Sequence, residues 1–232
     1  MTPPTIRRIT LVLSVAAGVT AASAVRSGAQ STPPASTQPA TSQQGNVAAI
    51  ARAKADSARY PYTQADIDFM SHMIGHHAQA IVMSQMAPTH GASPAVLRLA
   101  DRIINAQQDE IATMQHWLGD RRQPVPDAKP MGMKMMMNGV EHVMLMPGML
   151  TDEQMKQLDD ARGKEFDRLF LTFMIQHHRG AVSMVQDLFG SYGAGQDEIV
   201  FKFANDVSVD QTTEIARMER MLALLTLGVG SE

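Results

Sequence analysis

The sequence predicts an all-α fold, a four-helix bundle built from two duplicated helical hairpins that are joined by a long methionine-rich crossover. Three observations predict it. Apolar residues recur with a helical period in several long segments, no segment alternates with the period of a strand, and the two halves of the chain resemble each other. Long amphipathic helices with one extended central connection are typical of a bundle.

The first part of the chain is expected to lie outside this bundle. Residues 1–24 combine Arg7 and Arg8 with a short apolar run and an Ala-Ser-Ala cleavage site, which is the pattern of a signal peptide. Residues 25–62 are rich in Ser, Thr, Pro and Gln, and predict a flexible linker with room for one short helix. We therefore expect a periplasmic or secreted protein with no stable membrane span after the signal peptide is cleaved.

The first helical hairpin is predicted over residues 63–119. Thr63 and Asp66 have the spacing of a capping box at its start. Ser93 followed by Pro94 marks the start of its second helix, because Ser is a favoured N-cap and Pro is well tolerated at the first helical position.

The second helical hairpin is predicted over residues 151–228, where Thr151 and Gln154 have the spacing of another capping box. Between the hairpins, residues 120–150 contain four prolines and are predicted to form an irregular crossover rather than a helix. The bundle as a whole is predicted over residues 63–228.

An internal repeat relates the two hairpins. The segment from Phe69 to His77 aligns with the segment from Phe170 to His178, and each ends in a His-His pair. The pattern Gln-x-x-Glu-Ile-x-x-Met then occurs once in each partner helix, beginning at Gln107 and at Gln211. Agreement over the His pair, its flanks and the partner helix is improbable by chance, so we infer that one hairpin has been duplicated.

The duplicated residues include candidate ligands for a soft metal ion. Residues three, four and seven apart share a face of a helix, so Met70, Met73 and His77 form one stripe. The two histidines of a pair lie about 100° apart around the helix, so we expect one to face the interior and the other a seam between helices. The candidate ligands are Met70, Met73, His76, His77, Met83, Glu110 and Met114 in the first copy, and Met174, His177, His178, Met184, Glu214 and Met218 in the second.

Glu110 and Glu214 lie on the apolar stripes of their helices. A buried carboxylate is costly unless it is paired or binds a metal, so we expect Glu110 to meet His77 and Glu214 to meet His178 in the middle of the bundle. The alternative is a metal-free network of His–Glu hydrogen bonds in which the methionines only fill the core.

The crossover holds eight of the 19 methionines. The crossover shows no sustained helical or strand period, so packing in a hydrophobic core explains its many methionines poorly. Thioether sulfur is a soft neutral ligand that favours Cu(I), whereas imidazole also accepts Cu(II). The alternative is an oxidation-buffering or partner-binding surface. The candidate ligands here are Met131, Met133, Met135, Met136, Met137, His142, Met144, Met146 and Met149.

The composition limits the possible functions. The chain has no cysteine, so disulfides and thiolate metal sites are excluded and any soft ligand must be methionine. Its formal net charge is −3, and loss of Arg7 and Arg8 with the signal peptide makes it more acidic. Such a chain has no electrostatic footprint for nucleic acid.

The two Phe-x-x-x-Met-Ile-x-His-His segments, each followed by Ala three residues on, resemble the domain-of-unknown-function 305 (DUF305) family. So do Gln107 through Leu118 and the Met146-Pro-Gly-Met149 run that precedes residues 166–170. The resemblance covers about residues 62–227. It implies a ferritin-like bundle, commonly exported, and similar proteins include periplasmic copper binders linked to copper tolerance. It also implies that the methionines and histidines of both motif copies are the ligands, although Leu171 replaces the methionine found at Met70.

We therefore expect an exported metal-binding protein that binds copper through Met and His for buffering, storage or delivery, with a copper-transport protein as the partner in delivery. Cu(I) is the favoured ion and Cu(II) the second choice. No catalytic constellation is found, so an enzyme is not expected. The alternatives are a ferritin-like metal-dependent oxidase, which would need more core carboxylates than Glu110 and Glu214, and a metal-free helical interaction module.

Overall fold

The computed structural model describes residues 61–137 and 139–228. The predicted signal peptide, residues 1–24, and the predicted linker up to residue 60 lie outside the described residues. All described residues belong to one compact unit that begins at Gly45. Among the described helices, none has the length and apolar character that a membrane span needs.

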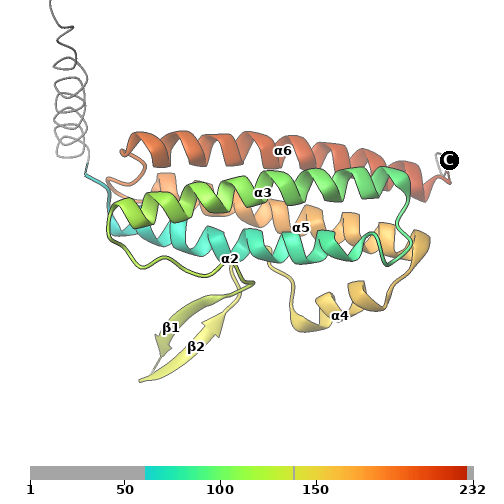
Figure 1. Ribbon diagram of the computed structural model, residues 1–232, viewed down its shortest axis with the longest axis horizontal. Helices are drawn as coiled ribbons and strands as arrows, with labels where there is room; N and C mark the ends of the chain where they lie inside the picture. The colour runs from blue at the N-terminus through green and yellow to red at the C-terminus, as the bar shows by residue number, and fades with distance from the viewer. Residues whose placement is uncertain (1–60, 138, 229–232) are drawn as a thin grey trace, which may run out of the picture. The chain divides into compact units, whose positions relative to one another are not determined.

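Four long helices lie side by side and confirm the predicted all-α bundle (Figure 1). A fifth, short helix follows the crossover and precedes the third long helix. The helices are α2 (Gln64–Met86), α3 (Pro94–Asp120), α4 (Asp152–Asp160), α5 (Gly163–Gly190) and α6 (Glu198–Thr226).

The predicted capping residues begin three of the helices. Thr63 and Asp66 form the capping box of α2, and the second carboxylate oxygen of Asp66 accepts the backbone N–H of Gly195 at 2.7 Å. Thr151 caps α4 through Gln154, and Ser93 caps α3. Because Asp66 binds both its own helix start and the loop before α6, it ties the two hairpins together at one end of the bundle.

The helices pack most extensively within each hairpin, α2 on α3 and α5 on α6, and α2 on α5 joins the hairpins. The core consists of two clusters, which we name after their largest aromatic residues. The Trp117 cluster takes residues from the first half of α2 and the second half of α5, whereas the Phe166 cluster takes residues from the opposite halves. Helices α2 and α5 are therefore antiparallel, and their midpoints meet between the two clusters.

Trp117 anchors its cluster to the start of α6. The indole Nε1–H donates to Asp197 Oδ1 at 3.0 Å, and the guanidinium of Arg121 lies 4.3 Å from the centre of the indole ring. Asp197 is also the N-cap of α6, where it accepts the backbone N–H groups of Ile199 and Val200. The last turn of α3 is thus fixed to the first turn of α6.

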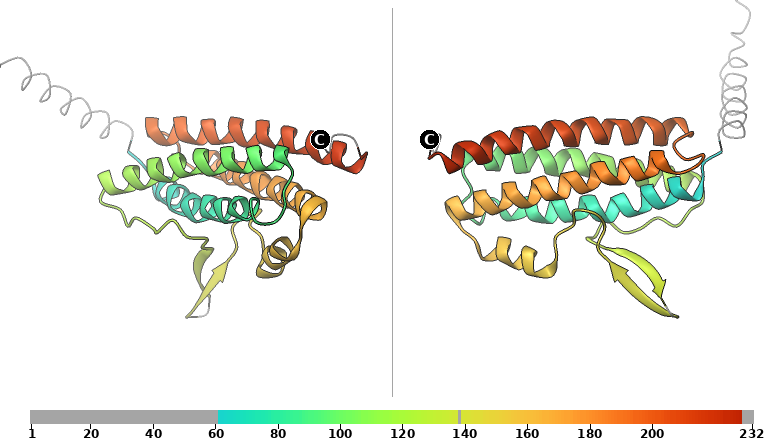
Figure 2. Two further views of the ribbon diagram at one scale, coloured as in Figure 1. Left: turned by 45° about the vertical axis from the view of Figure 1, so that its right-hand side comes forward. Right: turned by 180° about the vertical axis from the view of Figure 1, so that it is seen from behind.

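The crossover contains a β-hairpin, so the expectation that it holds no strand was wrong. Strand β1 (Met133–Met137) pairs with β2 (Val140–Met144) in an antiparallel two-stranded sheet. The sequence between the strands is Asn-Gly, which favours a two-residue hairpin turn, and Gly139 has a φ of +78°. Figure 2 shows that the hairpin projects from the bundle instead of packing along it.

The crossover is held against the bundle at its base. Gln79 of α2 exchanges two hydrogen bonds with the backbone of Leu150, at 2.8 and 3.0 Å. A Cβ at Gly180 of α5 would collide with the backbone of Pro147 and Gly148. Glycine therefore allows the crossover to approach α5 more closely than any other residue could.

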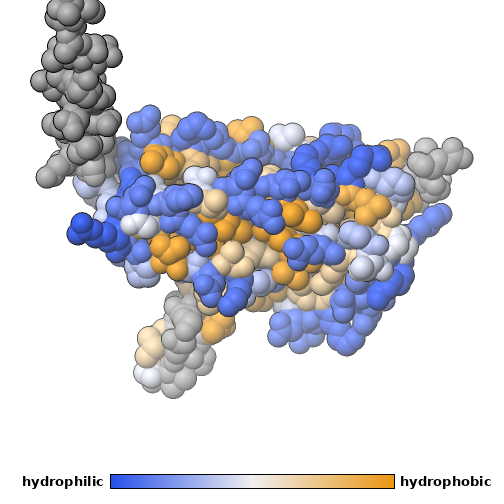
Figure 3. Space-filling view, viewed as in Figure 1, coloured by the Kyte–Doolittle hydropathy of each residue, from blue (hydrophilic) through white to orange (hydrophobic). Residues whose placement is uncertain are grey.

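The face seen in Figure 3 is mostly hydrophilic, with apolar residues gathered along its middle. Much of the accessible surface of any folded protein is apolar, so these residues need no ligand to explain them. The predicted ligands lie inside the bundle and on the projecting hairpin.

Candidate metal centre

Both His-His pairs lie at the middle of the bundle. His76 and His77 follow the Trp117-cluster residues of α2, and His177 and His178 follow the Phe166-cluster residues of α5. Because α2 and α5 are antiparallel, the pairs meet where the two clusters adjoin. All four imidazoles are completely buried.

The first histidines of the two pairs face each other across the seam between α2 and α5. The ring centroids of His76 and His177 are 3.9 Å apart. His76 Nε2 lies 3.0 Å from the carbonyl oxygen of Pro147. A carbonyl only accepts, so Nε2 donates and Nδ1 of His76 carries the lone pair. That Nδ1, and both ring nitrogens of His177, have no hydrogen-bond partner among the described residues.

The second histidines contact the glutamates of the partner helices. His178 Nε2 lies 2.8 Å from Glu214 Oε2, and the guanidinium of Arg102 donates twice to Glu214 Oε1, at 2.8 and 3.0 Å. A carboxylate that already binds a guanidinium is ionised, so His178 Nε2 donates, and its Nδ1 has no hydrogen-bond partner among the described residues. Glu214 thereby fixes the tautomer and the orientation of the ring.

The first copy of this contact is less complete. His77 Nε2 is also 2.8 Å from Glu110 Oε2, but the two groups are not aligned as a hydrogen bond, and neither atom has another partner in the described part of the chain. The expected meeting of His77 with Glu110 and of His178 with Glu214 is present, but only the second pair is satisfied.

Burial keeps His76 and His177, the two histidines that face each other, neutral. Burial, together with the neighbouring His77, lowers the pKa of His76 to about 3. Burial and the facing His76 lower the pKa of His177 well below its usual range. A metal binds only the neutral imidazole, so these side chains need to lose no proton before they bind one.

Methionines border the histidines on both sides. The Trp117 cluster contains Met70, Met73, Met114 and Met184, and the Phe166 cluster contains Met83, Met174 and Met218. The two sets are equivalent under the repeat, except that Leu171 stands where Met70 would be. All seven methionines are buried. Their thioethers therefore occupy the layers next to the imidazoles.

The described residues hold no group of three His, Asp or Glu side chains placed to bind a metal. A groove of about 480 Å³ between α3 and α6 reaches the glutamates from outside, and Glu110, Glu214, Gln107 and Gln211 are among its lining residues. The glutamate side chains thus separate the buried histidines from solvent.

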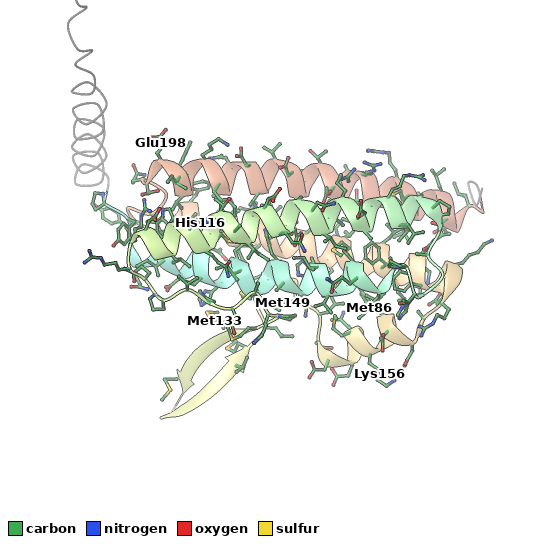
Figure 4. The ribbon with its side chains drawn as sticks, in the orientation of Figure 1. Met86, His116, Met133, Met149, Lys156 and Glu198 are labelled. Carbon is green, nitrogen blue, oxygen red and sulfur yellow. The ribbon has the colours of Figure 1, made fainter. Side chains whose placement is uncertain are left out.

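The candidate methionines of the crossover lie in different places, some in the core of the bundle and others on the projecting hairpin. Met146 and Met149 are buried in the Trp117 cluster, which corrects the expectation that packing explains this segment poorly. Met131, Met136 and Met144 are exposed, and Met133 packs partly against the bundle where the hairpin meets it (Figure 4). For Met135, Met137 and His142 the structure fixes the position in the strands.

Three polar residues at the centre were missed. Gln107 and Gln211 are buried beside the glutamates, and their repeat in the sequence could have indicated them. Arg102 has no counterpart in the repeat, because Asp206 occupies the equivalent position. Its contact with Glu214 depends on how α3 lies against α6, which no local pattern shows.

The DUF305 model, described as a domain of unknown function, matches residues 66–222. This chain belongs to the DUF305 family. A DUF305 protein of Streptomyces coelicolor is 30% identical with a TM-score of 0.57, covering 72% of this chain and 95% of that one. A DUF305 fragment from Deinococcus radiodurans is 26% identical with a TM-score of 0.58, covering 70% of this chain and 98% of the fragment.

CopM, in its Cu(I)-bound form, is also similar to this DUF305 chain. It is 28% identical with a TM-score of 0.51, and the match covers 67% of this chain and 94% of CopM. CopM structures bound to Cu(II) and to silver are similar as well. No curated protein matches the chain.

Proposed function

We propose that this DUF305 protein binds copper at the centre of its bundle. The observation that carries the proposal is the state of the buried imidazoles. His76 and His178 each donate one ring N–H to a fixed acceptor, and the other ring nitrogen of each has no hydrogen-bond partner among the described residues. Histidines that bind metals are held in this way, with one nitrogen oriented by an acceptor and the other facing the ion.

The chemistry of the donors favours copper over harder ions. The only soft side chains available are thioethers, since the chain lacks cysteine, and buried methionines lie on both sides of the imidazoles. Thioethers select Cu(I), and imidazoles accept both oxidation states of copper. CopM has been obtained with Cu(I), Cu(II) and silver, which supports the same class of ion here.

The proposal is one of binding and not of catalysis. The central carboxylates Glu110 and Glu214 are each engaged by a histidine, whereas ferritin-like oxidases use several carboxylates as ligands. We propose that the protein is exported and that it buffers, stores or delivers copper, passing it to a copper-transport protein in the last case. The amino-terminal pattern and a related Streptomyces coelicolor protein described as secreted support export.

The test is a copper titration of the full chain. In competition with a chromophoric chelator, the protein is expected to bind copper, and electron paramagnetic resonance of the Cu(II) form is expected to show nitrogen ligands. Changing His76→Leu together with His177→Leu removes two central imidazoles while filling their space with apolar side chains. This variant is expected to lose the nitrogen signal and at least one equivalent of copper.

The matched control is His116→Leu, which changes an exposed histidine on the outer side of α3 (Figure 4). It is expected to bind as the unchanged protein does. If the double variant kept the full copper content and the nitrogen signal, the central site would be wrongly assigned.

A further inference from the structure

The register of the β-hairpin sorts its residues into two chemically different faces. Residues directly paired across two strands lie on the same face of a sheet, and so do alternate residues of one strand. The pairs Met133–Met144, Met135–His142 and Met137–Val140 therefore share one face. The opposite face takes Lys134, Met136, Glu141 and Val143.

Soft ligands are concentrated at the positions of the first face, which we call the thioether face. It holds Met133, Met135, Met137, His142 and Met144, so Val140 is its only position without a soft ligand. The opposite face holds a single methionine. A hairpin made only to cover apolar surface has no need of this sorting, because Val, Ile and Phe suit strands better than Met does.

We propose that the thioether face is a second metal site, separate from the bundle centre and selective for a soft monovalent ion, Cu(I) or Ag(I). The inference rests on the proposed function and deepens it. The adjacent pairs Met133–Met144 and Met135–His142 supply three thioethers and one imidazole. Residues directly opposite have Cβ atoms about 4.5–5.5 Å apart, and methionine is flexible enough to converge on one ion from there.

The placement of this face distinguishes it from the central site. Met144, at one end of it, is 46% exposed, whereas the central imidazoles are completely buried. Thioethers need no deprotonation, so three of its four donors bind equally well in acid. Harder ions such as Zn²⁺ and Cu(II) prefer nitrogen and oxygen donors. The hairpin therefore offers an accessible Cu(I) site, whereas the bundle offers an enclosed one.

Two neighbouring methionines give a matched test in the full chain. Met135→Leu changes the thioether face, and Met136→Leu makes the same change at the next residue, on the opposite face. Competition with a Cu(I) chelator is expected to show affinity for the hairpin ion about tenfold weaker or more in M135L and unchanged in M136L. The triple variant Met133→Leu, Met135→Leu, Met144→Leu is expected to lose one Cu(I) equivalent and its sulfur scattering in X-ray absorption.

Equal effects of M135L and M136L would overturn the inference, and so would a triple variant that keeps its full Cu(I) content. The failures of the two proposals are distinguishable. An unchanged protein that binds no copper rejects the proposed function and the hairpin site together. Copper lost on changing His76 and His177, but untouched by the triple variant, rejects the hairpin site alone. Binding of a membrane or a protein in place of copper would likewise reject it.

Discussion

The four central histidines differ in what orients them. A backbone carbonyl from the crossover orients His76, and a glutamate of α6 orients His178. His77 approaches its glutamate without aligning to it, and His177 has no partner in the described part of the chain. The duplicated sequence therefore gives four chemically unequal imidazoles, two of them oriented by a hydrogen bond and two without one in the described part of the chain.

Because the two histidine–glutamate contacts differ, substitution of Glu214 and of Glu110 is expected to lower the free energy of unfolding by different amounts. Glu214→Gln weakens the hydrogen bonds from His178 and Arg102, and it is expected to destabilise the metal-free protein by about 1.5–3 kcal/mol. Glu110→Gln disturbs only the misaligned contact with His77, so it is expected to cost less than about 1 kcal/mol. Urea unfolding of both variants measures the difference. Equal losses would show that Arg102 adds nothing to the second copy.

Among the elements, the crossover determines how the centre is closed. It places the carbonyl of Pro147 on His76, and it can do so because Gly148 and Gly180 meet without side chains. Two hydrogen bonds between the backbone of Leu150 and the side chain of Gln79 then fix the crossover to α2, on the other side of the seam between α2 and α5. The crossover is consequently part of the central site, even though its hairpin points away from the bundle.

A pair of glycines on α5 tests this closure. Gly180→Ala would force the crossover away from α5, and it is expected to destabilise the protein by about 1–3 kcal/mol and to weaken copper binding at the centre. Gly190→Ala adds the same methyl group where no neighbouring atom lies within 4 Å, and it is expected to be neutral or to stabilise by up to about 1 kcal/mol. Thermal unfolding and copper titration of both variants provide the comparison. If Gly180→Ala changed neither the thermal stability nor the copper affinity, the close approach of the crossover to α5 would not be needed for the central site.

The elements also show what the sequence could and could not predict. The helix starts follow from Thr63, Ser93 and Thr151, because a cap is a local interaction between neighbours in the chain. The hairpin was equally local, with an Asn-Gly turn between alternating methionines, but methionine is not a typical strand residue and the period was overlooked. The contact of His76 with Pro147 joins residues far apart in the chain, and no local pattern indicates it.

In the whole molecule, the duplication produces an approximate twofold arrangement. Each half supplies one His-His pair, one glutamate and methionines to a shared centre. The repeat predicted this convergence, because equivalent helices of duplicated hairpins pack in equivalent ways. The replacement of Met70 by Leu171 was visible in the sequence, whereas the contact of Arg102 with Glu214 was not.

The buried histidines predict an acid-sensitive fold. Burial lowers the pKa of His76 to about 3, whereas an unfolded histidine titrates near 6.5. The unfolded chain therefore takes up this proton first, and stability is complete above pH 6.5 and falls as the pH drops from there toward 3. The loss from His76 alone is up to roughly 5 kcal/mol.

Urea unfolding of the metal-free protein at several pH values between 7 and 4 measures how steeply the free energy of unfolding falls with pH. The variant with His76→Leu and His177→Leu is expected to have a shallower slope, since it lacks the two imidazoles whose pKa burial lowers. Identical slopes in the two proteins would show that these imidazoles do not control the acid response.

The position of Trp117 has a practical consequence. It is the only tryptophan of the chain, it is buried, and its cluster contains the methionines of one side of the centre. The opposite methionines lie in the other cluster. Quenching of its fluorescence on titration with copper is therefore expected to report on that side of the centre, so one optical measurement can tell which side of the centre fills first.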